Sequence, residues 1–111
     1  MNNATSLHER EIIEFLQEQG CSSIEVEAGS LVALRTGRDG RLYPLSIDIY
    51  EEDPQGAPSA HRFRARAARR FGLPVTYHHG ADVRSALEGI DWGTLDRPLT
   101  RPMSSTLVGV L

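Results

Sequence analysis

The chain has 111 residues, 40% hydrophobic and 24% charged, and its formal net charge is −3. This is enough apolar sequence for one core, so we expect one domain over residues 1–92 and an extended tail over 93–111. A lone Cys21 excludes an intrachain disulfide, and no apolar run approaches the roughly 20 residues that span a bilayer.

The first residues lack the basic and then apolar pattern of a signal peptide, so we expect a soluble, cytoplasmic protein with no membrane partner. Cys21 follows the first predicted helix and has no flanking cation that would lower its pKa. We interpret it as a small apolar residue and not as a reactive thiol.

The first predicted element is a helix over residues 7–19. Ser6 and Glu9 have the spacing of a capping box, and Gly20 can adopt the left-handed conformation that ends a helix. Between these signals, apolar residues recur at helical spacing, namely Ile12, Phe15 and Leu16.

Three strands should follow. Residues 23–28 alternate as a half-exposed strand does, and the apolar run 31–34 is typical of a strand covered on both faces. A turn at residues 37–40 leads to a third strand over 42–50. In this strand Leu45, Ile47 and Ile49 alternate with a polar set that shares the other face: Ser46, Asp48 and Tyr50.

A second helix is predicted over residues 58–71, because Pro58 suits a first helical position and Phe63, Ala67 and Phe71 recur at helical spacing. All twelve basic residues of the chain are arginines, and five of them lie in this region, which has no acidic residue. Four of the five would share one flank of the helix: Arg62, Arg66, Arg69 and Arg70.

A fourth strand over residues 75–78 and a last helix capped by Asp82 complete the predicted domain. The tail contains Pro98 and Pro102 and ends in an apolar segment, 106–111, that could form a final strand. We interpret that segment as an edge strand of the protein's own sheet, or alternatively as a surface for a partner or a homodimer.

The predicted order is αβββαβα, an α+β or α/β domain with a central mixed sheet flanked by helices. From about residue 9 to 90 this order resembles the restriction-endonuclease-like PD-(D/E)XK nucleases, in particular the virus-type replication-repair nuclease domains. The resemblance follows a run of features. They are a helix with glutamates, Gly29-Ser30 before a strand, a strand ending Asp48-Ile49-Tyr50, Pro58-Ser59-Ala60-His61-Arg62-Phe63, Gly72-Leu73-Pro74-Val75 and Asp82-Val83-Arg84.

In that family an aspartate and a Glu-x-Lys motif bind a divalent metal. By position these residues correspond to Ser30, Asp48 and Tyr50, so the resemblance implies a degenerate active site with Asp48 and Tyr50 as its catalytic candidates. Active Mg²⁺-dependent cleavage would need a second carboxylate beside Asp48. Glu27 is our candidate metal ligand, with Glu25, Glu11 and Glu14 as further possibilities. Without such a site we expect no cofactor.

Other motifs are weak. His78 and His79 could bind a metal with His61 or His8, but neighbours on a strand point to opposite faces. The arginine flank has two interpretations, a phosphate-binding surface or a solvated face neutralised by Glu51, Glu52 and Asp53.

Three functional hypotheses follow. The first is a disabled nuclease-fold domain that binds nucleic acid through the arginine-rich helix. The second is a small protein-binding factor, such as an inhibitor, an immunity protein or a mobile-element accessory protein. The third is an active metal-dependent nuclease with a relocated carboxylate.

Overall fold

Five strands form an antiparallel meander in which each strand pairs with the next one along the chain. A computed structural model describes residues 2–52, 59–69 and 74–97. The sheet order is β2-β3-β4-β5-β6, and a two-residue strand β1 (Asn2–Asn3) pairs with the end of β4. The five strands are β2 (Ser22–Glu27), β3 (Ser30–Thr36), β4 (Leu42–Glu51), β5 (Phe63–Arg69) and β6 (Val75–Gly80).

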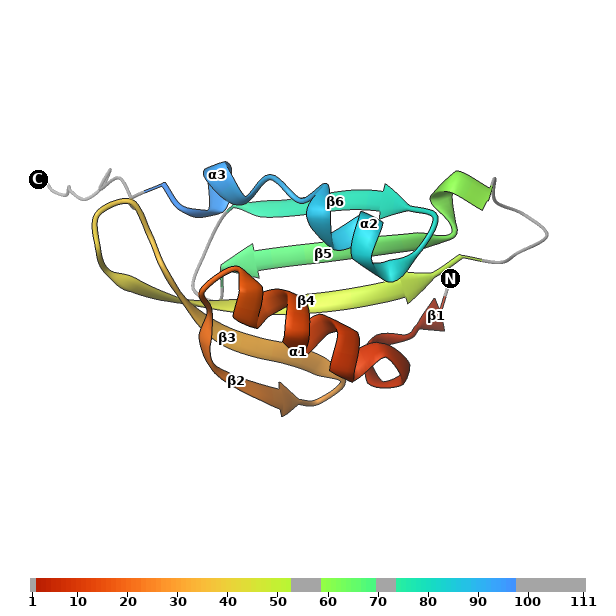
Figure 1. Cartoon of the computed structure of the whole chain (residues 1–111), viewed down its shortest axis with the longest axis horizontal. Coiled ribbons are helices and arrows are strands. Elements are labelled where there is room, and N and C mark those ends of the chain that lie inside the picture. Colours follow the sequence, from red (N-terminus) through yellow and green to blue (C-terminus); the bar gives the residue numbers. More distant parts are fainter. Residues whose placement is uncertain (1, 53–58, 70–73, 98–111) are drawn as a thin grey trace, which may run out of the picture.

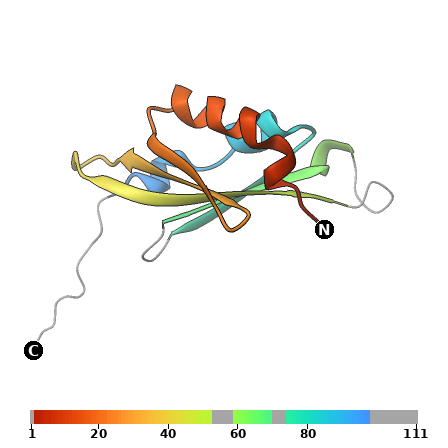
Figure 2. The ribbon, with the colours of Figure 1, turned by 90° about the horizontal axis from the view of Figure 1, so that it is seen from below.

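The helices lie against one side of this sheet, as Figure 2 shows for α1 and α2. α1 (Glu9–Glu18) follows a single turn of 3-10 helix, and the two short helices are α2 (Val83–Glu88) and α3 (Trp92–Leu95). Figure 1 shows α1 in front of β3 and β4, and α2 in front of β5 and β6. The fold is therefore α+β, with helices and sheet in two layers.

The core fills the space between the two layers. α1 contributes Ile12, Phe15 and Leu16, while Gly80 of β6 allows α2 to approach closely, since a Cβ there would lie 2.4 Å from the Ala86 nitrogen. Along most of β4 and β5 every second residue is apolar and faces this core, as expected for strands with one face covered by helices. The sheet side of the core consists mainly of Leu31, Ala33, Leu45, Ile47, Ile49, Ala65 and Ala67.

The predicted helix over residues 58–71 is wrong, because Phe63–Arg69 is strand β5. The same residues fit a period of two, with Phe63, Ala65 and Ala67 on the buried face and Arg64 and Arg66 on the other. β5 pairs along its length with β4 and β6, and these ladder hydrogen bonds outweigh the helix propensity of its alanines. The predicted αβββαβα order is therefore wrong as well, because a strand replaces its second helix. The predicted mixed sheet is also wrong, because all described strand pairs are antiparallel.

The first helix and the three following strands are confirmed, with small shifts at their ends. The capping box is wrong, because α1 begins after His8 and has no side-chain cap. Gly20 does end the helix with a φ of 81°, and the Asp82 side chain caps α2 by accepting a hydrogen bond from the Ser85 amide.

Two further expectations are wrong, one about the burial of β3 and one about the start of the C-terminal tail. The run 31–34 is buried on one face only, since Val32 and Leu34 are half-buried. The expected tail over 93–111 begins in helix α3, whose Leu95 is buried in the core. Asp96 then accepts two hydrogen bonds from Arg35, at 2.6 and 3.0 Å. The possible strand 106–111 lies outside the described residues.

Two leucines of β4 provide a test of which face is the core. Leu45 is 1% exposed and Leu42 is 56% exposed. We predict that Leu45→Ala lowers the free energy of unfolding by about 2–5 kcal/mol, because it leaves a cavity beneath the helices. Leu42→Ala is the matched control and should change stability by less than about 0.5 kcal/mol in the same urea titration. Equal losses would contradict the assigned faces.

Candidate binding surface

The sheet face opposite the helices carries the polar residues of β4, β5 and β6, and within the described parts of the chain no helix lies against it. The register places Asp48 opposite Arg66 and Arg66 opposite Tyr77, so these three side chains share this face. We call it the open face. Its residues include Ser30, Val32, Leu34, Ser46, Asp48, Tyr50, Arg64, Arg66, Tyr77 and His79.

Asp48 lies at the centre of the open face and is 5% exposed. The Ser30 hydroxyl donates a hydrogen bond to its Oδ1 at 2.5 Å, and a guanidinium nitrogen of Arg66 lies 3.4 Å from its Oδ2. The pKa of Arg66 is raised, first by its hydrogen bond with Tyr77 and further by the charge of Asp48. The carboxylate is therefore held by a hydroxyl and a permanent cation, as a buried charge requires.

Arg64 forms the second feature of the open face. Its guanidinium carbon lies 5.2 Å from the centroid of the Tyr50 ring and 4.9 Å from that of Tyr77, which places the cation against both rings. The Arg64 Nε is buried and has no hydrogen-bond partner among the residues that the structure describes. Beside it, the His79 ring lies 5.1 Å from that of His61, and its Nε2 is 3.9 Å from a carboxylate oxygen of Glu52.

Of the four arginines expected on one helix flank, the three that the structure describes do not come together. Arg62 donates to Glu51 at 2.9 and 3.1 Å, and Arg66 faces Asp48. Arg69 points to the helix side of the sheet, where it is buried and donates to the carbonyl oxygen of Leu95 at 3.0 Å. Its role is structural, while Arg70 lies outside the described residues.

Sequence reasoning missed Arg64, because its position did not fit the helical flank. The signal that could have found it is the alternation of arginine with alanine in Arg64-Ala65-Arg66-Ala67. Read with a period of two, this pattern puts Arg64 and Arg66 on one face.

The structure brings together part of the site that the nuclease resemblance implied. Ser30 contacts Asp48, and Tyr50 lies on the same face of the same strand. Glu27 pairs with Ser30 and therefore lies two strands from Asp48. The backbones of two strands so placed are about 10 Å apart. α1, which carries Glu11 and Glu14, lies on the helix side of the sheet.

The metal hypotheses find little support in this arrangement. Within residues 2–52, 59–69 and 74–97 no cluster of three or more His, Cys, Asp or Glu side chains could hold a metal ion. The register of β6 gives His78 and His79 opposite faces: His79 is opposite Arg64 on the open face, and the His78 ring packs against Gly89 after α2.

No protein-family model, curated protein or solved structure matches this chain. Among the described residues, no helix is long and apolar enough to cross a membrane.

The pairing of Asp48 with Arg66 can be tested by a double-mutant cycle. We predict a coupling energy of about 0.5–3 kcal/mol between Asp48→Ala and Arg66→Ala in urea unfolding, because each change removes the partner of a buried carboxylate or of a half-buried guanidinium. The cycle for Glu51 and Arg62, whose side chains are more exposed, should give a smaller coupling. Additive effects at Asp48 and Arg66 would contradict the contact.

Cys21 is buried at the end of α1, which agrees with its interpretation as a small apolar residue. Burial raises the pKa of its thiol, although the neighbouring Arg35 acts in the opposite direction. A raised pKa lowers the thiolate fraction at neutral pH, and the thiolate is the form that reacts.

We therefore predict that iodoacetamide alkylates native Cys21 at least tenfold more slowly at pH 8 than the urea-unfolded chain. The native rate should rise further as the pH is increased above 8. Mass spectrometry of quenched samples gives both rates, and equal rates in the two states would show that the thiol is accessible and ionised.

Proposed function

We propose that this chain is a small protein-binding factor that docks its partner on the open face of the sheet. The observation that supports this most directly is the arrangement of Arg64 between the rings of Tyr50 and Tyr77. It lies on a sheet face that none of the described helices covers. Tyr77 is 51% exposed, so part of this cluster is available for contact.

The tyrosines and arginines of the open face support this proposal. Tyrosine and arginine are enriched among the residues that contribute most to binding, whereas lysine is depleted, and this chain has no lysine. The two rings also restrict the Arg64 side chain before any partner arrives. Less conformational entropy is then lost on binding than with a freely moving arginine.

The alternatives have weaker support from the same residues. Sequence-independent nucleic-acid binding uses several uncompensated cations, but Arg66 and Arg62 face Asp48 and Glu51, and the net charge is −3. Metal-dependent cleavage would need a second carboxylate at Asp48, whose described partners are Ser30 and Arg66. Protein binding places neither demand on the surface. It fits an inhibitor, an immunity protein or an accessory protein.

The test is site-specific photocrosslinking in an extract of the source cells. A benzoylphenylalanine at position 77, on the open face, should crosslink one protein that the same residue at position 14, on α1, does not. The purified protein should then form a stoichiometric complex with the unmodified chain. Arg64→Ala should weaken this complex at least tenfold, or about 1.4 kcal/mol, in isothermal calorimetry.

Arg84→Ala is the matched control, because Arg84 is an exposed arginine on the helix side that pairs with Glu18 and Glu88. It should leave the affinity unchanged, and circular dichroism should show that both variants are folded. The proposal is wrong if crosslinks form from position 14 only, or if Arg64→Ala and Arg84→Ala have the same effect.

A further inference from the structure

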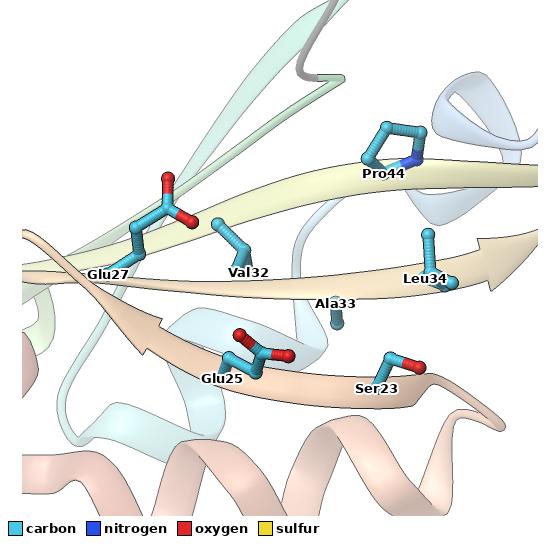
Figure 3. Close-up of a pocket in the computed structure, with 7 residues that line it drawn as sticks. All are labelled: Ser23, Glu25, Glu27, Val32, Ala33, Leu34 and Pro44. Atoms are coloured by element: carbon cyan, nitrogen blue, oxygen red, sulfur yellow. The ribbon is translucent and has the colours of Figure 1, made fainter.

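The open face ends in a pocket beside the edge strand β2, at the far side from Arg64. It is formed by β2, β3 and β4, and Figure 3 shows the side chains that line it. The pocket has a volume of about 200 Å³, which is below the roughly 300–1,000 Å³ of sites for drug-sized ligands. It is therefore of a size for a single side chain.

The floor of this pocket is apolar. Val32 and Leu34 of β3 and Pro44 of β4 are all half-buried, and β2 passes alongside them. A β-bulge interrupts the pairing of β2 with β3, because Ser22 pairs with Leu34 while Glu25 pairs with Val32. Such a bulge bends the edge strand locally, which shapes the wall of the pocket.

The wall carries two exposed carboxylates. Glu25 is opposite Val32 and Glu27 is opposite Ser30, so both side chains are on the open face, next to the apolar floor. Among the described residues no cation lines the pocket, and the arginines of the open face lie on β5, three strands from β2. The open face is therefore acidic at β2 and basic at β5.

An apolar floor with a carboxylate rim is complementary to one kind of side chain. Arginine lays its aliphatic stem along apolar surface and keeps its charged head at a polar rim. Its guanidinium also binds carboxylates through two parallel hydrogen bonds, which the ammonium of lysine cannot do. We infer that this pocket receives an arginine side chain from a basic segment of the partner protein. This inference rests on the proposed function and identifies the chemistry of the partner.

The direct test uses blocked arginine, N-acetyl-arginine amide, as the probe in an NMR titration of the whole chain. The methyl signals of Val32 and Leu34 and the amide signals of Glu25 and Glu27 should shift together. The citrulline analogue, which has nearly the same shape but no charge, should bind at least tenfold more weakly. Shifts that map elsewhere, or equal binding of the citrulline analogue, would overturn the inference.

A charge-matched pair of variants separates the pocket from the overall charge of the protein. E25Q with E27Q should weaken binding of blocked arginine at least tenfold. E9Q with E14Q changes the net charge equally but lies on α1, so it should leave binding unchanged. Equal losses in the two double variants would show a general charge effect and overturn the inference.

The complex with the crosslinked partner distinguishes this inference from the proposed function. Loss of the complex on E25Q with E27Q as well as on Arg64→Ala supports both. If Arg64→Ala disrupts the complex and the double variant does not, the open face binds a partner but the arginine pocket is wrong. If the crosslinked species is a second copy of this chain, the assignment to a separate partner protein is wrong; sedimentation velocity would show that dimer.

Discussion

The antiparallel pairing of β4 with β5 determines where the charged residues of this protein lie. It places Asp48 opposite Arg66 and Tyr50 opposite Arg64, while Ile47 and Ile49 pair with Ala67 and Ala65 on the core side. A shift of one residue would turn the arginines toward the helices, where their charges would be buried without partners. The core and the open face therefore depend on the same register.

The two faces of the sheet differ in what stabilises them. The covered face is stabilised mainly by apolar packing. Two arginines of the sheet also bind the segment at α3, since Arg35 donates hydrogen bonds to Asp96 and Arg69 donates one to the Leu95 carbonyl oxygen. On the open face, stabilisation comes from side chains that contact one another across strands. Ser30, Asp48, Arg66 and Tyr77 form one such row over four strands, and Arg64 contacts both Tyr50 and Tyr77. These contacts restrict the side chains of the open face before any ligand binds.

Much of the first half of the fold could be predicted from the sequence, because its patterns are local. The helix ending at Gly20 and the alternation of Leu45, Ile47 and Ile49 with Ser46, Asp48 and Tyr50 each indicate one structure. β5 could not be assigned in this way, since Phe63 and Ala67 fit helical spacing as well as alternation. Only the pairing with β4 and β6 on either side decides between helix and strand. The helical flank expected for the arginines is wrong for that reason. The alternation along the third strand did place Asp48 on the same face as Ser46 and Tyr50.

The most direct measurement is the NMR assignment of residues 63–69. We predict extended secondary chemical shifts for Phe63–Arg69, with cross-strand nuclear Overhauser effects joining Asp48 to Arg66 and Arg66 to Tyr77. Helical chemical shifts with contacts between residues three apart would contradict this prediction. In that case the open face, its arginine held between two tyrosines and the pocket's place at its acidic end would all have to be abandoned.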